Sequence, residues 1–210
     1  MITIALPTGR VLIEALDVLS RLDLPVSLLK SRGRELVIED GPYRYILAKP
    51  MDVPLHVTYG AADLALVGSD VMWEMNAPLI ELADTGRGKC RIVIAGPERM
   101  AKRFLGHESE LMWLRIATKY PNIADRYFSS RGVQVEIIHM HGSIELAPML
   151  GLSDCILDIV QTGSTLKANH LKIFENVTPV SLRLAGSVKS VQTKWEEISI
   201  ILNKMESLRV

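Results

Sequence analysis

Short apolar runs alternate with amphipathic stretches of helical spacing, and this alternation restricts the fold more than any other feature of the chain. The first run, Ile2 to Leu6, is followed by the turn Pro7-Thr8-Gly9 and then by leucines at three- and four-residue steps. Further strands are expected at positions 63–67, 91–95, 115–118, 134–139 and 155–160. Strands separated by helices pair in parallel, so we expect an α/β protein.

Other local patterns predict a hairpin and a terminal helix. Asp40-Gly41-Pro42 separates two apolar runs at positions 36–39 and 43–48, which is typical of a hairpin turn. Asp52 is suited to the N-cap of a helix that begins at Val53. One amphipathic helix is expected near the C-terminus, where apolar residues recur at helical steps: Val188, Val191, Trp195, Ile198, Leu202 and Met205.

The composition excludes several classes of protein. The 210 residues carry 24 basic and 24 acidic side chains, which argues against a general nucleic-acid binder. The longest uncharged stretch is ten residues, whereas a membrane-spanning helix needs about 20, so no membrane span is expected. The N-terminus lacks the features of a secretory signal, and Cys90 and Cys155 lack metal-site spacing. We therefore expect a cytoplasmic protein with two buried, reduced thiols.

The most informative stretch joins a buried strand to a helix through Thr162-Gly163-Ser164-Thr165. Such a turn offers free backbone N–H groups, hydroxyl donors and the positive end of a helix dipole to a phosphate. Asp158, four residues earlier, is placed to accept hydrogen bonds from a ribose hydroxyl pair. The alternative is an ordinary strand–helix junction with Thr or Ser as the N-cap. The Walker A and GxGxxG patterns are both absent from the sequence.

This stretch resembles the loop with which phosphoribosyltransferases bind 5-phosphoribosyl 1-pyrophosphate (PRPP). Those enzymes usually carry two adjacent acids before the turn, and here Leu157 replaces the first. The replacement argues against the purine and pyrimidine salvage type.

Further segments resemble the short form of the ATP phosphoribosyltransferase family, in family order across nearly the whole chain. They are Ile4-Ala5-Leu6-Pro7-Thr8-Gly9-Arg10, Asp52-Val53-Pro54, Gly60-Ala61-Ala62-Asp63-Leu64, Gly68-Ser69-Asp70, Ile116-Ala117-Thr118-Lys119-Tyr120-Pro121 and Gly142-Ser143-Ile144-Glu145-Leu146-Ala147-Pro148. The resemblance implies two α/β lobes of the periplasmic-binding-protein-like (type II) kind, with a ligand cleft between them. Domain I would comprise residues 1–88 and 180–210, and domain II residues 89–179.

The resemblance also implies the reaction, which is the first step of histidine biosynthesis. ATP and PRPP would give N1-(5-phosphoribosyl)-ATP and pyrophosphate with Mg²⁺ as cofactor. Because adenine N1 carries a lone pair, no general base is expected, and catalysis would come from positioning and from stabilising the leaving group.

Residue roles follow from the resemblance where the residues match. Thr162, Gly163, Ser164 and Thr165 would hold the 5-phosphate, and Asp158 with Glu145 the ribose hydroxyls. Glu145 is also explained as a charge stabilised by a helix N-terminus. Arg10, Arg34 and Lys49 are the catalytic candidates, facing pyrophosphate or the ATP phosphates.

Several assignments remain open. Arg32 is an alternative to Arg34, and Lys30 lies close to both. Asp70 would either border the adenine pocket or cap the helix that follows. The family commonly has lysine in place of Thr8 and arginine in place of Lys49. The first difference removes a cation from the pyrophosphate side, and the second keeps the charge but loses the guanidinium fork. His139 and His141 lack a third ligand, so no protein metal site is expected.

By resemblance, short-form chains act as homodimers with a separate regulatory subunit similar to histidyl-tRNA synthetase. Two alternatives come from other classes of protein. A ligand-binding module without catalysis would share the two lobes but has no use for Asp158 ahead of Thr162-Gly163. A salvage-type phosphoribosyltransferase would share the loop but normally needs the acid that Leu157 replaces.

Overall fold

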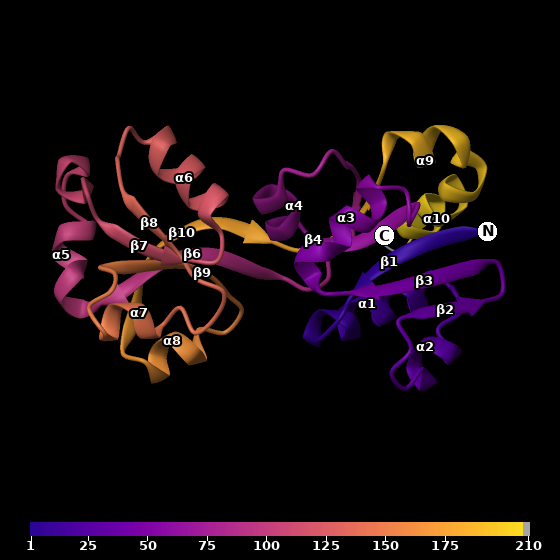
Figure 1. Ribbon diagram of the computed structural model, residues 1–210, viewed down its shortest axis with the longest axis horizontal. Coiled ribbons are helices and arrows are strands. Elements are labelled where there is room, and N and C mark those ends of the chain that lie inside the picture. Colours follow the sequence, from indigo (N-terminus) through magenta and orange to yellow (C-terminus); the bar gives the residue numbers. More distant parts are fainter. Residues whose placement is uncertain (208–210) are drawn as a thin grey trace. The chain divides into compact units, whose positions relative to one another are not determined.

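The computed structural model describes residues 1–207, which divide into two compact units, each with its own mixed sheet (Figure 1). Unit 1 comprises Met1–Gly88 and the segment from Ser181 onward, and unit 2 comprises Lys89–Val180. The chain therefore passes between the units after Gly88 and after Val180, where the sequence suggested crossings near Gly88 and Pro179. Within residues 1–207, no helix is long and apolar enough to cross a bilayer.

Unit 1 has a six-stranded sheet in the order β2-β3-β1-β4-β11-β5. Its strands are β1 (Ile2–Pro7), β2 (Val37–Asp40), β3 (Tyr43–Ala48), β4 (Leu64–Gly68), β5 (Ile80–Asp84) and β11 (Leu182–Gly186). Its helices are α1 (Arg10–Arg21), α2 (Ser27–Ser31), α3 (Val53–Thr58), α4 (Ser69–Met75), α9 (Val188–Thr193) and α10 (Trp195–Ser207), with a 3₁₀ turn at Pro50–Asp52. Strand β1 pairs in parallel with β3 and β4, so the carboxyl ends of these three strands lie at one edge.

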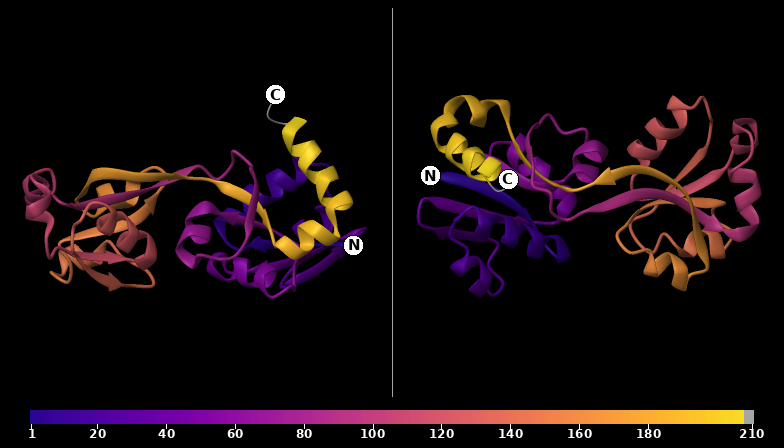
Figure 2. Two further views of the ribbon diagram at one scale, coloured as in Figure 1. Left: turned by 90° about the horizontal axis from the view of Figure 1, so that it is seen from above. Right: turned by 180° about the vertical axis from the view of Figure 1, so that it is seen from behind.

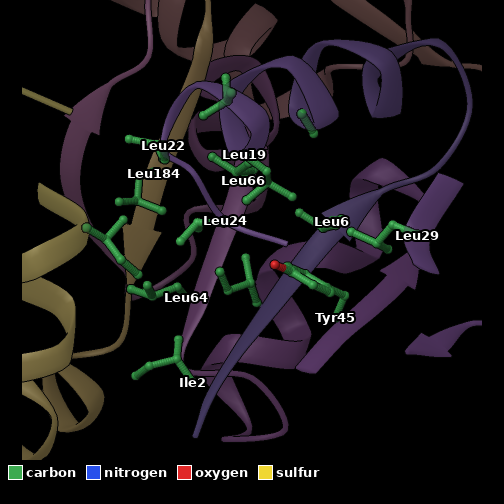
Figure 3. Close-up of a cluster of buried hydrophobic side chains, with 14 of the residues drawn as sticks. Ile2, Leu6, Leu19, Leu22, Leu24, Leu29, Tyr45, Leu64, Leu66 and Leu184 are labelled. Carbon is green, nitrogen blue, oxygen red and sulfur yellow. The ribbon is translucent and has the colours of Figure 1, made fainter. Parts of the chain in front are cut away.

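The core of unit 1 forms where α1 and the C-terminal helices cover the sheet. Figure 3 shows Leu19 of α1 in one buried cluster with Leu6, Leu64 and Leu66 of the central strands. Tyr45 is fully buried among them and donates its hydroxyl proton to the Pro25 carbonyl at 2.8 Å. The predicted β2–β3 hairpin is confirmed, with antiparallel pairing from Val37↔Ile46 to Asp40↔Tyr43.

The single C-terminal helix predicted from the sequence is wrong. The segment forms two helices, α9 and α10, separated at Lys194 (Figure 2). Lys194 donates to the Asp63 carboxylate at 2.7 Å, which ties the break to the start of β4. Trp195 and Val188, predicted on the buried stripe, are more than half exposed, whereas Ile201 is buried. The rest of the predicted stripe does face the core: Ile198 and Met205 are buried, and Val191 and Leu202 pack against the same cluster.

Unit 2 has a five-stranded sheet in the order β10-β6-β9-β7-β8. Its strands are β6 (Cys90–Pro97), β7 (Arg115–Thr118), β8 (Glu136–His139), β9 (Cys155–Val160) and β10 (Leu171–Val180). Its helices are α5 (Ala101–Phe104), α6 (Pro121–Ser130), α7 (Leu146–Met149) and α8 (Ser164–Ala168), with 3₁₀ turns at Glu98–Met100 and Glu108–Leu111. Figure 1 shows α6 on one face of this sheet and α7 with α8 on the other.

The parallel pairing expected from the strand–helix alternation is confirmed for only part of each sheet. In unit 2, β7 pairs in parallel with β8 and β9, but β6 pairs antiparallel with both β9 and β10. Strands β5, β10 and β11 are not predicted from the sequence, because charged and turn-forming residues interrupt their apolar residues. Neither cysteine forms a disulfide; Cys155 is buried as expected, whereas Cys90 is only half-buried, so the prediction of a buried thiol is confirmed for Cys155 and wrong for Cys90.

Candidate active site

Asp158 lies near the carboxyl end of β9, the central strand of unit 2. Side chains alternate along a strand, so Asp158 shares a face with Ile156 and Val160, which pack in the core beneath α7 and α8. Its side chain is only 12% exposed. Burying a carboxylate in so apolar a setting costs free energy unless the charge is paired. Carboxylates kept in such settings cluster at functional sites, which marks Asp158 as a functional candidate.

Four residues after Asp158, the chain turns from β9 into α8 through Thr162 and Gly163. Gly163 is the N-cap of α8 and has φ 81° and ψ 5°, the left-handed conformation that glycine adopts at least cost. Thr162, Ser164 and Thr165 are all exposed, and the hydroxyl oxygens of Thr162 and Ser164 lie 3.1 Å apart.

The first amides of α8 point into this turn. Among the described residues no side chain caps the helix, and the Ser164 N–H has only a long 3.4 Å contact with the Thr162 hydroxyl. The alternative of an ordinary junction capped by Thr or Ser is therefore wrong, because glycine holds the N-cap position. The turn leaves hydroxyls and backbone N–H groups available to an anion.

Glu145 joins Asp158 at the same edge of the sheet. It is half-buried and is the N-cap of α7, in the segment that follows the carboxyl end of β8. A helix of four residues has little dipole, which weakens the explanation of Glu145 as a dipole-stabilised charge. Ser143, two residues earlier, has φ 50°, so this segment is held in a conformation that non-glycine residues rarely adopt.

The neighbouring charges act on Asp158 in opposite directions. Burial raises the pKa of Asp158 above its ordinary value, and the Glu145 charge raises it further. Lys119 and the backbone N–H of Ile159 lower the pKa and offset part of that effect. The carboxylate is therefore held by a balance between burial and one nearby cation.

Lys119 has no role in the sequence-based assignment, although the structure places it in the site. It follows the carboxyl end of β7, and its Nζ lies 3.5 Å from Asp158 Oδ1. Lys119 and Asp158 each directly follow a member of the last β7–β9 register pair, Thr118↔Leu157. The signal that would have identified Lys119 is its place: it is a cation one residue beyond a predicted strand, and that strand is adjacent to the strand that carries Asp158.

In unit 1, the three catalytic candidates lie on connections at the edge formed by the carboxyl ends of β1 and β3. Arg10 is the first residue of α1, directly after the β1 turn, and Lys49 directly follows β3. The Thr8 N–H donates to the Ala48 carbonyl at 2.8 Å, which holds the two turns together. Arg34 precedes β2, in a loop whose Leu36 carbonyl accepts from the Leu47 N–H at 2.8 Å at the end of β3.

The exposure of these cations fits a role toward anions. Arg10, Arg34 and Lys49 are exposed, whereas Arg32, the alternative to Arg34, is half-buried. Arg34 is thus the more exposed of the two, and the choice between Arg32 and Arg34 stays a prediction.

Asp70 lies at the same edge, in the first turn of α4 after the end of β4. It is buried, and its carboxylate bends back so closely over Gly68 that a Cβ there would overlap it. The N-cap of α4 is Gly68, so Asp70 is a first-turn acid and not the cap. The prediction that Asp70 borders an adenine pocket stays a prediction.

The site residues thus form two sets, one in each unit. Unit 2 contributes two carboxylates, a lysine and a glycine turn rich in N–H and hydroxyl donors, while unit 1 contributes exposed cations. Residues 1–207 contain no group of three or more His, Cys, Asp or Glu side chains able to hold a metal ion. His139 and His141, with ring centroids 4.8 Å apart, remain a pair.

Comparisons with known proteins agree with this chemistry. Residues 49–207 match the family model described as HisG: ATP phosphoribosyltransferase. An ATP phosphoribosyltransferase of Caldicellulosiruptor bescii is 43% identical over 211 residues, covering 99% of each chain. One from Sorangium cellulosum is 43% identical over 209 residues, covering 98% of this chain and 95% of that one.

Solved structures agree on the architecture. The ATP phosphoribosyl transferase (HisG:HisZ) complex from Thermotoga maritima contains a chain with TM-score 0.82 and 32% identity, covering 99% of this chain and 98% of that one. The arginine-binding protein ArgBP of T. maritima (TM-score 0.62, 12% identity, covering 99% and 90%) shares the fold alone. The two lobes are therefore of the periplasmic-binding-protein-like kind, as expected. The chain belongs to the ATP phosphoribosyltransferase family, whose enzymes catalyse the first step of histidine biosynthesis.

Proposed function

We propose that this chain binds PRPP at the carboxyl end of β9 and transfers its phosphoribosyl group to N1 of ATP, releasing pyrophosphate. The observation that carries the proposal is a buried acid on the central strand, Asp158, followed four residues later by an uncapped glycine turn. Burial raises the pKa of this carboxyl group, and such perturbed groups cluster at functional sites.

The 5-phosphate is assigned to Thr162, Gly163, Ser164 and Thr165. The left-handed Gly163 lets the backbone turn sharply, and the exposed hydroxyls on either side supply further donors. Charge-assisted hydrogen bonds of this kind are about twice as strong as those between neutral groups.

The ribose hydroxyls are assigned to Asp158 and Glu145. Each carboxylate accepts hydrogen bonds from hydroxyl groups, and Asp158 lies near the end of β9, shortly before the turn, where a sugar attached to the bound phosphate would lie. Leu157, the residue before it, points to the opposite face of the sheet and is fully buried, so a second adjacent acid would have no access to a ligand.

The pyrophosphate and the ATP phosphates are assigned to Arg10, Arg34 and Lys49. Positive charge spreads over the ribose ring carbon and oxygen as pyrophosphate leaves, while the departing oxygens gain negative charge. Exposed cations on short connections stabilise those oxygens. Adenine N1 attacks with its own lone pair, so no side chain has to remove a proton.

Mg²⁺ is proposed as the cofactor, carried by the pyrophosphate oxygens of the donor. Mg²⁺ keeps several waters and commonly binds through substrate phosphates together with few protein groups. The lack of a metal-binding cluster among residues 1–207 supports this arrangement over a site built from side chains alone. When bound, the ion would neutralise charge on the leaving group.

The assembly is proposed to be a homodimeric catalytic core joined to a regulatory subunit that resembles histidyl-tRNA synthetase. The support is the T. maritima HisG:HisZ complex, whose matching chain is covered over 98% of its length by this one. We also propose that the reaction takes place in the cytoplasm, which suits two cysteines that form no disulfide. Mass measurement of the chain alone and with a HisZ-type partner tests the assembly.

The reaction itself is tested with purified protein, PRPP, Mg²⁺ and ATP, with and without a HisZ-type subunit. We expect the absorbance of phosphoribosyl-ATP to rise in step with pyrophosphate release. Parallel reactions replace ATP with free purine and pyrimidine bases. Product with bases only would make the chain a salvage enzyme, and PRPP binding without turnover under every condition would make it a binding module.

A further inference from the structure

The ion pair between Lys119 and Asp158 joins the ends of two adjacent parallel strands. Lys119 Nζ lies 3.5 Å from Asp158 Oδ1, and each residue directly follows a member of the last β7–β9 register pair, Thr118↔Leu157. The backbone of Lys119 is fixed on both sides. Thr118 before it is fully buried and accepts a 2.9 Å hydrogen bond from the Tyr120 N–H, and Pro121 begins α6.

The two partners differ in their surroundings. The Lys119 side chain is 38% exposed, whereas that of Asp158 is 12% exposed. Asp158 Oδ1 is buried and has no hydrogen-bond partner among the described residues, so the lysine is its electrostatic partner without satisfying its hydrogen-bonding capacity. An acceptor left unsatisfied in this way suits a ligand hydroxyl.

The charges that face Asp158 come from two neighbouring elements. Lys119 approaches from the β7–α6 connection and Glu145 from the start of α7, while the N–H of Ile159 belongs to β9 itself. The rest of that face is the apolar core beneath α7 and α8. Lys119 is thus the cation that opposes both the burial of Asp158 and the Glu145 charge.

Lys119 also contacts an aromatic ring. Its Nζ lies 5.1 Å from the centroid of the Tyr120 ring, within the range of a cation–π contact. The ammonium group is therefore held between a carboxylate and an aromatic face, which restricts the orientations that the long side chain can adopt.

We propose that Lys119 is a positioning residue that holds the Asp158 carboxylate ionised and in place to accept the ribose hydroxyls of the donor. This inference rests on the proposed function and adds a residue to it. Lys119 acts through Asp158 and does not itself contact the phosphates.

The test compares Lys119→Met, Lys119→Arg, Asp158→Asn and the double variant Lys119→Met/Asp158→Asn, with Lys172→Met as an exposed-lysine control. We expect Lys119→Met to raise the KM for PRPP about tenfold, with kcat and the KM for ATP changing little. The rise is larger at pH 6 than at pH 8, because loss of the cation raises the pKa of Asp158. Lys119→Arg restores most of the affinity, and Lys172→Met behaves as wild type.

The double variant separates action through Asp158 from direct binding. We expect it to be no worse than Asp158→Asn alone, because the lysine then has no carboxylate to hold. An equal loss in both backgrounds would mean that Lys119 binds the donor directly, and an unchanged KM in Lys119→Met would mean that the pair is only structural. Either result overturns the inference about Lys119, but the proposed function stands as long as the wild type turns over. Absence of wild-type turnover would overturn the proposed function itself.

Discussion

The two units use the same architectural position for opposite chemistry. In each, the site residues lie at the carboxyl ends of parallel strands, which is where α/β proteins commonly bind ligands. Unit 1 places exposed cations there, on the short connections after β1 and β3. Unit 2 places a buried carboxylate within the strand and an anion-binding turn after it.

This difference separates site residues whose burial lowers the stability of the fold from site residues that leave its stability unchanged. An exposed arginine is solvated whether or not a ligand is present, so its removal affects ligand binding and little else. A buried aspartate loses hydration when the chain folds, and that cost is recovered only if a ligand or a nearby cation uses the charge. Asp158 should therefore show a conflict between stability and function that the exposed cations of unit 1 lack.

The largest effect is expected for Asp158→Asn. The amide keeps the size of the carboxylate but loses the charge that accepts the ribose hydroxyls. Charge-assisted hydrogen bonds contribute about 1.5–3 kcal/mol, so kcat/KM for PRPP should fall by about 10- to 150-fold. Steady-state kinetics with varied PRPP measure the loss. Unchanged turnover at low PRPP would remove the ribose assignment.

A smaller loss is expected for Gly163→Ala. A Cβ at Gly163 meets Val160 Cγ1 at 3.8 Å, an ordinary contact, so the cost comes from φ 81° and not from crowding. Forcing an L-residue into the left-handed region costs about 1–2 kcal/mol, and the turn should shift to avoid it. We expect a weaker affinity for PRPP and a lower melting temperature. Gly163→Asn, which tolerates this conformation better, is the matched control and should lose less.

In unit 1, Arg10→Ala should lower kcat/KM by about tenfold without changing the melting temperature, because Arg10 is exposed. Arg21→Ala is the matched control. Arg21 is in the last turn of the same helix, paired with Asp17, and should leave the kinetics unchanged. A fall in stability for Arg10→Ala, or equal kinetic losses in both variants, would contradict the comparison between the units.

The parts of the site that follow a simple strand–turn–helix rule are predictable from the sequence. The strands over Arg115–Thr118 and Cys155–Val160 have the predicted bounds, because both are short and largely buried runs of mostly apolar residues. The turn at Gly163 follows from its residue types in the same way. These elements depend on local pattern, and local pattern is what a sequence displays directly.

Long-range pairing is what the sequence concealed. The proximity of Lys119 to Asp158 depends on β7 and β9 being neighbours, although β8 lies between them along the chain. Strand β10 contains two register shifts against β6, which disrupt the alternation that would have marked it as a strand. The break at Lys194 depends on Asp63, more than a hundred residues earlier, so helical spacing alone could not reveal it.

The smallest predicted effect concerns stability and pH, and it tests the cost of the buried acid directly. Burial raises the pKa of Asp158 in the folded state above its value in the unfolded chain. Between these two pKa values the folded state binds more protons than the unfolded state. Asp158 therefore destabilises the fold increasingly as pH rises through this range. Asp158→Asn should consequently melt at the same or a slightly higher temperature than wild type at pH 8. This advantage should shrink toward pH 4, where the wild-type carboxyl group becomes protonated, and Arg10→Ala should show no such trend. Melting temperatures of the wild type and both variants are measured from pH 4 to pH 8. If the stability of Asp158→Asn relative to wild type is lower at pH 8 than at pH 4, the effect of Lys119 on the pKa of Asp158 is larger than the effect of burial.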